Sequence, residues 1–115
     1  SLIQGADKGS VYRHSSGFIY RKERNSVVVD GVEIFLSAIQ DLLLELLVQN
    51  QNKVISRKEL SQRIWGNNED TLLVNKHIQH LRRIIKDRQI EGGKLFTIIR
   101  SDYNGYMLIN SRFDS

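Results

Sequence analysis

The segment from Ser37 to Asn50 constrains the fold more than any other part of the sequence. Its apolar residues recur at helical spacing and cover nearly every side of a helix: Ile39, Leu42, Leu43, Leu44, Leu46, Leu47 and Val48. A helix of this kind is buried on most sides. Because the chain has 115 residues, enough for one domain, this helix is expected to form the centre of a single core, with Ser37 as its cap.

Short β-prone runs lie before this helix. Phe18–Tyr20, Val27–Val29 and Val32–Phe35 predict three short antiparallel strands, and Asp30-Gly31 is a tight-hairpin signal. The preceding residues are small and polar without a clear period. We therefore expect a flexible tail or linker over residues 1–16, one domain over 17–110 and a second tail over 111–115.

Two more helices are predicted after the first. Ser56 and Glu59 have the spacing of a capping box, in which each side chain bonds a free backbone amide at the helix start. This second helix is about ten residues long and stops at Gly66. After a polar loop, Thr71 is expected to cap a third helix that runs to about Asp87.

The third helix has the most informative pattern. Its predicted buried residues fall within about 60° of one another on a helical wheel: Val74, Ile78, Leu81 and Ile85. The opposite face carries polar and basic side chains: Lys76, Gln79, His80 and Arg83. One flank carries Asn75, Arg82 and Lys86. Such a polar outer face is common on helices, so alone it is weak evidence of nucleic-acid binding.

The C-terminal region predicts a β-hairpin. Leu95–Ile99 and Tyr106–Ile109 are expected to be strands, with Asn104-Gly105 in the turn between them and Gly92-Gly93 in an earlier turn. With the three helices and the N-terminal strands, this hairpin gives an α+β fold.

Positive charge is concentrated in one part of the chain. Residues 53–100 hold eleven Lys and Arg against five Asp and Glu, so this segment carries +6, whereas the whole chain carries +4. A basic region on an otherwise acidic body is typical of a protein that binds a polyanion. The alternative is an unevenly solvated surface.

Several functional classes have no support in the sequence. Cysteine is absent, which excludes disulfides, thiolate metal sites and cysteine nucleophiles. His77 and His80 have no evident third metal ligand, and the glycine pair lacks the phosphate-loop lysine. No apolar run is long enough to span a membrane. We therefore expect no enzyme activity, no cofactor, no metal, no small-molecule substrate and no membrane contact.

A short helix, a loop, a long basic helix and a hairpin suggest a helix-turn-helix variant, in which the last helix enters the major groove. The chain also resembles the winged-helix DNA-binding domain shared by OmpR/PhoB-type response regulators and ToxR/CadC-like transcription activators. The matching stretches lie within residues 17–109: Leu36–Leu47, Val54–Trp65, Val74–Arg82 and Phe96–Leu108.

This resemblance implies a winged helix-turn-helix with a four-stranded N-terminal sheet, a three-helix core and a C-terminal hairpin, the wing, over about 96–109. The fourth strand would lie around Val11-Tyr12. The third helix, about 71–87, would be the recognition helix, and the wing would contact the backbone or the minor groove.

The resemblance also implies roles for individual residues. Base contacts would come from Leu73, Asn75, Lys76 and His80. Phosphate contacts would come from His77, Gln79 and Arg82, with Arg100 acting from the wing. Arg57, Arg82, Arg83 and Arg100 would fix the register on the duplex. The loop after the second helix would touch RNA polymerase through Asn67, Asn68, Glu69 and Asp70.

Two features depart from the family pattern. The wing usually reads Arg-Gly-x-Gly-Tyr, whereas Arg100–Tyr106 is two residues longer and carries Asp102, which would repel phosphate. Leu72 and Leu73 are unusually apolar for a groove-facing turn; they could touch a thymine methyl group, but packing against the wing is the favoured interpretation.

Trp65 is expected in the core, and Tyr103 is expected to be a cross-strand partner of Tyr106.

The predicted function is sequence-specific binding of double-stranded DNA by a domain of a bacterial, cytoplasmic transcription regulator. Two copies on repeated half-sites are expected, because one such module buries little surface. Sensing would lie elsewhere, in a receiver domain before residue 17, as in two-component systems, or in a membrane sensor after residue 109. Two alternative functions are also compatible with the sequence. One is a winged-helix protein-interaction module that uses the wing, Leu72 and Leu73, and the other is binding of nucleic acid without sequence preference.

Overall fold

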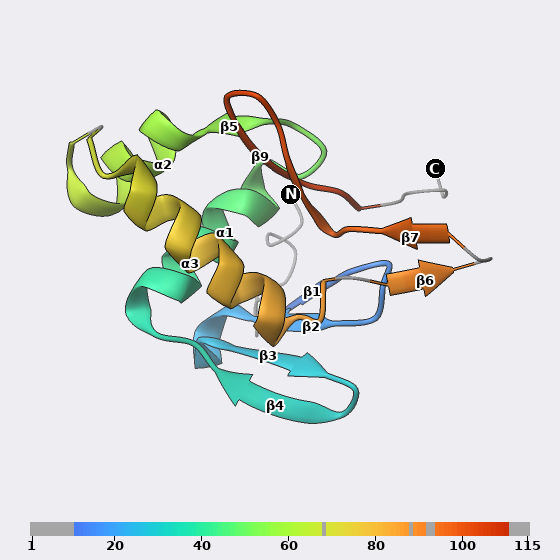
Figure 1. Cartoon of the computed structure of the whole chain (residues 1–115). Coiled ribbons are helices and arrows are strands. Elements are labelled where there is room, and N and C mark those ends of the chain that lie inside the picture. Colours follow the sequence, from blue (N-terminus) through green and yellow to red (C-terminus); the bar gives the residue numbers. More distant parts are fainter. Residues whose placement is uncertain (1–10, 68, 88, 92–93, 111–115) are drawn as a thin grey trace.

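The N-terminal part of the chain forms a four-stranded antiparallel sheet. The computed structural model describes residues 11–67, 69–87, 89–91 and 94–110. The sheet has the order β1-β2-β3-β4 and is coloured from blue to turquoise in Figure 1: β1 Val11–Arg13, β2 Ile19–Arg21, β3 Ser26–Val29 and β4 Val32–Phe35. A 3-10 helix, Lys22–Arg24, connects β2 to β3. The predicted Asp30-Gly31 hairpin is confirmed, since both residues have the positive φ angles (52° and 81°) that a tight turn requires.

Strand β1 corrects the predicted N-terminal tail. Tyr12 pairs with Tyr20 of β2, and both Tyr12 and His14 are buried. The fourth strand expected from the family resemblance therefore exists where it was placed, and residues 11–14 are part of the fold and not of the tail assigned to 1–16. A three-residue strand is too short to show alternation, which is why periodicity did not reveal it. Residues 1–10 and the predicted tail over 111–115 lie outside the described residues.

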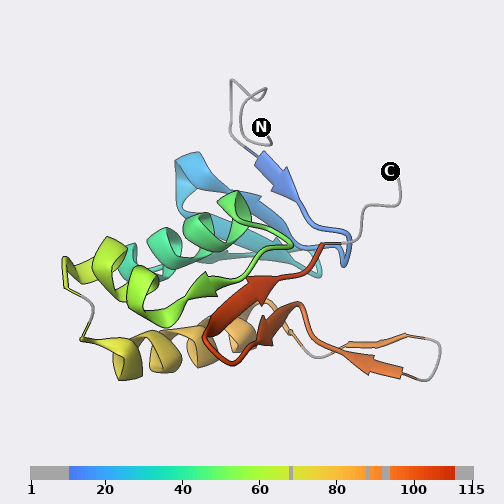
Figure 2. The same cartoon turned by 90° about the horizontal axis from the view of Figure 1, so that it is seen from above.

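Helix α1, Ala38–Gln49, occupies the centre of the fold, as its pattern predicted. Figure 2 shows α1 between the sheet on one side and α3 on the other. Ser37 caps it with a full capping box, because the Gln40 side chain returns a bond to the Ser37 backbone. Its buried apolar residues are Leu43, Leu44, Leu46, Leu47 and Val48.

Helix α2, Arg57–Trp65, begins and ends as predicted. Ser56 accepts a hydrogen bond from the backbone N–H of Glu59, and Gly66 ends the helix in the left-handed conformation. The capping box is only half formed, since the Glu59 carboxylate instead lies 3.9 Å from the Arg63 guanidinium.

Helix α3, Thr71–Ile84, starts and stops slightly differently from the prediction. Asp70, not Thr71, is the N-cap, because the buried Ser61 hydroxyl fixes the Asp70 backbone N–H at 3.0 Å. The helix ends three residues before Asp87. The Asp87 carboxylate is buried and accepts hydrogen bonds from the backbone N–H groups of Ile98 and Ile99. Asp87 therefore belongs to the segment that connects α3 to the C-terminal strands, and not to α3 itself.

The C-terminal region contains two hairpins, whereas one was predicted. β6 (Gln89–Glu91) pairs with β7 (Lys94–Phe96), and this hairpin extends away from the body (Figure 2). The wing consists of β8 (Ile99–Ser101) and β9 (Gly105–Leu108), with β5 (Ile55–Ser56) added beside β9. The predicted strand over 95–99 is therefore divided, because Asp87 takes the amides that would have continued it. The predicted turn at Gly92-Gly93 lies outside the described residues.

A buried carboxylate ties the sheet to α1. Asp41, 4% exposed, accepts from the Tyr20 hydroxyl at 2.7 Å and from Lys22 Nζ at 2.8 Å. Burial, together with the hydrogen bond and charge of Asp41, raises the pKa of Tyr20 far above its ordinary value. Burial alone would lower the pKa of Lys22, but Asp41 and Glu45 outweigh it and raise that pKa. The three side chains thus form a paired and satisfied group inside the domain.

A second polar cluster joins β1 to the end of β9. His14 Nδ1 accepts from the Ser16 backbone N–H at 2.9 Å, so Nε2 carries the proton and donates to the Ile109 carbonyl at 2.7 Å. Ser15 N–H donates to Asn110 Oδ1, and Asn110 Nδ2 donates to Gln51. Burial lowers the pKa of His14, although its bond to Ile109 acts in the opposite direction. The cluster therefore requires neutral His14.

No helix within the described part of the chain has the length and apolar character needed to cross a membrane.

We predict that Asp41→Ala lowers the free energy of unfolding by about 2 kcal/mol, because the buried Tyr20 hydroxyl loses its side-chain acceptor. Glu45→Ala is the matched control: Glu45 also contacts Lys22 Nζ, at 2.9 Å, but is more exposed. Its loss should cost less than about 1 kcal/mol. Urea unfolding followed by circular dichroism measures both, and equal effects would contradict the prediction.

We predict that the domain loses stability as pH falls below about 6.5, the ordinary histidine value. Because the folded-state pKa of His14 is depressed, the unfolded chain takes up the proton first, so the free energy of unfolding falls toward the folded-state pKa. The slope is at most about 1.4 kcal/mol per pH unit for each such histidine. His14→Gln should flatten the profile measured by urea unfolding between about pH 7.5 and 5.5; a flat wild-type profile is the contrary result.

Candidate nucleic-acid interface

Helix α3 presents two opposite faces, as the helical pattern predicted. Val74, Ile78 and Leu81 are fully buried, and Ile85 is 1% exposed. The opposite face is exposed to solvent along four turns: Leu72, Lys76, Gln79, His80 and Arg83. The hairpin of the wing lies on the same side of the molecule as this face (Figure 2). Together they form a surface with no negatively charged side chain on α3 itself.

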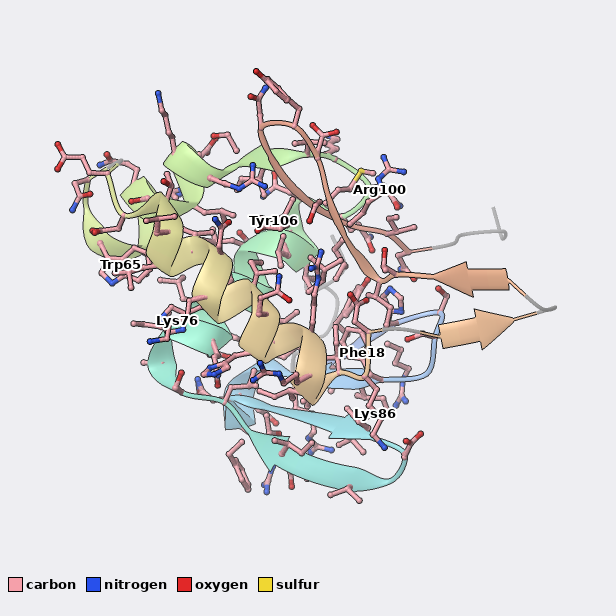
Figure 3. All side chains as sticks on the ribbon, viewed as in Figure 1. Phe18, Trp65, Lys76, Lys86, Arg100 and Tyr106 are labelled. Atoms are coloured by element: carbon pink, nitrogen blue, oxygen red, sulfur yellow. The ribbon has the colours of Figure 1, made fainter. Side chains whose placement is uncertain are left out.

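A hydrogen-bonded bracket joins α2, α3 and the wing. The Asn75 Oδ1 atom accepts from Arg57 Nε at 3.0 Å and from the Tyr106 hydroxyl at 2.6 Å. Arg57 also donates to the carbonyl of Tyr103 at 3.2 Å, and its guanidinium lies 4.7 Å from the centre of the Tyr106 ring. Figure 3 shows Tyr106 between α3 and the wing. The bracket therefore holds the wing beside the exposed face of α3.

Arg82 makes a second connection to the wing. Its guanidinium donates to the Ile99 carbonyl at 2.7 and 3.2 Å and to Ser101 Oγ at 3.0 Å. It also lies 3.2 Å from the buried Asp87 carboxylate, which in turn accepts from the backbone at the start of β8. Charge and geometry both fix Arg82 in this position.

Three predicted DNA-contact residues thus have internal partners. Arg57, Asn75 and Arg82 hold the wing against α3, whether or not they also touch DNA. Sequence reasoning missed Tyr106 and Asp87 as their partners. The available signals were a Gly-Tyr pair inside the predicted hairpin and an acid at the predicted end of the third helix, and neither pattern specifies a long-range contact.

His77 differs in its surroundings from its neighbours on α3. It is partly buried beside Trp65, with ring centres 6.0 Å apart, and its Nδ1 finds no hydrogen-bond partner among the described residues. Burial, and then the charges of His80 and Lys76, lower its pKa. His77 is therefore neutral near pH 7, unlike the cationic side chains that neutralise phosphates. Trp65 packs against the core, as expected.

No group of three potential metal ligands of the His, Cys, Asp and Glu types occurs in the described ranges.

The tip of the wing is more exposed than predicted. Tyr103 is 93% exposed, and Tyr106 instead pairs with Ser101 and with Ile55, so the expected Tyr103–Tyr106 pair is wrong. Arg100 is exposed on β8 and projects from the wing away from α3 (Figure 3). Gly105 has no space for a side chain, since an added Cβ would collide with the Ile55 carbonyl and lie 2.7 Å from Ser56 Cα. This close approach is what brings β5 and β9 together.

The loop between α2 and α3 is fixed from inside. The Ser61 hydroxyl donates to the Asn67 carbonyl at 2.6 Å, and Asn67 Nδ2 donates to the Asp70 carboxylate at 3.1 Å. Asn67 and Glu69 are exposed, and Asp70 is partly exposed. Asn68, the fourth residue predicted to contact polymerase, lies outside the described residues.

Leu72 and Leu73 lie in the first turn of α3 and are 80% and 40% exposed. The favoured expectation that both pack against the wing is therefore wrong for Leu72.

An open groove of about 480 Å³ lies farther along, between α3 and β8. Its lining is Gln79, Arg82, Arg83, Lys86, Asp87, Thr97 and Ser101.

Residues 31–108 match the protein family described as "Transcriptional regulatory protein, C terminal". The chain belongs to this family. It is a winged-helix DNA-binding domain of the OmpR/PhoB type, and membership of a family of transcription regulators agrees with the expectation that it is not an enzyme.

Curated relatives include a transcriptional regulatory protein and a response regulator. The chain is 29% identical over 110 residues to the transcriptional regulatory protein CpxR of Escherichia coli, which covers 94% of this chain and 46% of CpxR. It is 34% identical over 82 residues to the response regulator ArlR of Staphylococcus aureus, which covers 66% of this chain and 37% of ArlR. The chain thus spans less than half the length of these relatives.

Solved structures confirm the fold. The DNA-binding domain of CpxR from E. coli superposes with a TM-score of 0.70 at 25% identity, covering 87% of this chain and 96% of that one. The E. coli CadC DNA-binding domain has a TM-score of 0.70 at 21% identity, covering 90% and 94%. The Klebsiella pneumoniae RstA DNA-binding domain, solved in complex with the RstA box, has a TM-score of 0.70 at 19% identity, covering 86% and 96%.

We predict that Arg57→Ala destabilises the free protein by about 2 kcal/mol, because it removes a charged donor from Asn75 and from the wing. Arg63→Ala is the matched control on the same helix, since Arg63 is half-exposed and its carboxylate partner is 3.9 Å away. That change should cost less than about 0.5 kcal/mol. Thermal unfolding without DNA measures both. If Arg57→Ala leaves stability unchanged, the bracket does not hold the wing.

Proposed function

We propose that this domain binds double-stranded DNA in a sequence-specific manner, with α3 in the major groove and the wing on the adjacent backbone or minor groove. One observation carries the proposal: a continuous exposed face of α3, bearing Lys76, Gln79, His80 and Arg83, lies beside the wing. An α-helix fits the major groove of DNA, and basic side chains on its exposed face can bind phosphates and the acceptor atoms of guanine. The RstA DNA-binding domain, which has the same fold, was solved in complex with the RstA box, and this supports DNA binding by the present domain.

The residues on α3 divide by their surroundings. Lys76 and Arg83 lie nearest the centre of the exposed face and would supply the main contacts to bases or phosphates. Gln79 and His80 lie on either side of them. Arg57, Asn75 and Arg82 would act mainly by positioning the wing, since their polar atoms already have partners in the free domain. His77, beside Trp65, would contribute little charge.

Other elements complete the proposed regulator. Arg100 adds a positive charge on the side of the wing that faces away from α3, whereas Asp102 at the tip weakens attraction to phosphate there. The loop with Asn67, Glu69 and Asp70 offers an exposed polar surface that RNA polymerase could contact. A second copy on a repeated half-site would add the affinity that one module lacks. A regulator of this kind would work in the bacterial cytoplasm, with signal detection in another part of the protein.

A protein-interaction module is the second candidate. The exposure of Leu72, Leu73 and Tyr103 favours it, because large apolar side chains on a surface often mark a partner site. The basic face of α3 argues for DNA instead. Replacing both leucines by serine separates the two: a partner interface would be lost, whereas phosphate-based DNA binding would largely survive.

We predict that fluorescence anisotropy with random-sequence duplex DNA gives a log–log salt slope of roughly −4 to −5, because four to six phosphates are neutralised. The Lys76→Ala/Arg83→Ala double variant should reduce this slope by up to about two units. Arg13→Ala/Lys53→Ala is the matched control, since it removes two exposed charges from other elements. It should leave the slope nearly unchanged.

Two results would contradict the proposal: no binding by the folded domain at low salt, or an equal effect of the two double variants. Selection from a random DNA pool then tests sequence preference. Equal affinity for every duplex would favour binding without sequence specificity.

A further inference from the structure

We propose that Leu72 determines part of the DNA specificity, by contacting the 5-methyl group of a thymine in the major groove. This inference rests on the proposed DNA-binding function and assigns it one more residue and one base. It starts from an apolar side chain that is 80% exposed in the first turn of a helix whose exposed face is otherwise polar.

The position of Leu72 on α3 separates it from an ordinary surface leucine. At 100° per residue, Leu72 lies within about 40° of both Lys76 and Arg83, near the centre of the exposed face. It is one turn before Lys76 and three turns before Arg83 on the same line of the helix. A base edge that reaches Lys76 is therefore within one helical turn of Leu72 on the same line of the helix.

The chemistry of the base edges then selects thymine. In helix-turn-helix domains the N-terminal residues of the recognition helix contact base edges, and Leu72 is the second residue of α3. A leucine side chain can neither donate nor accept a hydrogen bond. The thymine C5-methyl is the apolar group that the major-groove base edges offer, so it is the group that Leu72 can recognise.

The position of Lys76 indicates which base lies near that thymine. Lys76 is one helical turn away, about 5.4 Å along the axis, whereas successive base pairs are about 3.4 Å apart. Lys76 pairs best with the O6 and N7 acceptors of guanine. The preferred half-site should therefore contain a thymine within about two base pairs of a guanine.

Val32 provides a matched control for this proposal. It is also an exposed aliphatic residue, 59% exposed, but it lies on β4 of the N-terminal sheet and not on α3. A thymine contact made by the exposed face of α3 would not involve Val32.

The test uses the duplex selected from a random pool as the preferred site of the wild-type chain. Each thymine is replaced singly by deoxyuridine, which removes only the 5-methyl group. At one or two positions the wild-type affinity should fall roughly fourfold, as expected for one methyl group returned to water. The Leu72→Ala variant should bind the thymine and uracil forms equally at those positions, while Val32→Ala should retain the wild-type difference.

The Leu72→Ala variant should fold normally, because alanine is a better helix former than leucine and Leu72 contributes little to the core. Circular dichroism of both variants checks this. If the chain selects a site but no thymine-to-uracil change alters affinity, or if Leu72→Ala keeps the difference, the inference is wrong and the proposed function stands. If the folded chain selects no site, the proposed function itself is wrong.

Discussion

The geometry of the interface depends on one amide oxygen. Asn75 Oδ1 accepts from both Arg57 and Tyr106, and thereby joins the start of α2, the middle of α3 and the last strand of the wing. Arg82 repeats the connection farther along, through the Ile99 carbonyl and Ser101. Since hydrogen bonds to charged donors are stronger than neutral ones, the wing has a defined position before any DNA arrives. Such preorganisation reduces the entropy lost on binding.

The same bracket imposes a cost on direct recognition. A guanidinium that already bonds two carbonyls has fewer free donors for a phosphate, and an amide oxygen shared by two donors is not available to a base. The exposed face of α3 carries side chains that have no such partners among the described residues: Lys76, Gln79, His80 and Arg83. On α3, supporting residues and proposed contact residues are thus neighbours in sequence, as in Asn75 and Lys76, but face different surroundings.

Features of this fold that depend on residues close together in the sequence could be predicted, whereas features that depend on distant residues could not. The two faces of α3, the burial of α1 and the caps at Ser37 and Ser56 depend on residues within about one or two turns, and these predictions are confirmed. Strand β1 and the break between β7 and β8 depend on distant partners, Tyr20 and Asp87; periodicity showed neither, and only the family resemblance implied β1. Outward placement of the candidate site residues was predictable; the engagement of Arg57 and Arg82 with the wing was not.

The cluster around His14 has a consequence for the last strand of the wing. It fastens the turn after β1 to residues 109 and 110, which directly follow β9. The C-terminal end of the wing is therefore tethered to the N-terminal sheet, while Asn75 and Arg82 tether the wing to α3. Protonation of His14 would act at the first tether and leave the exposed face of α3 untouched.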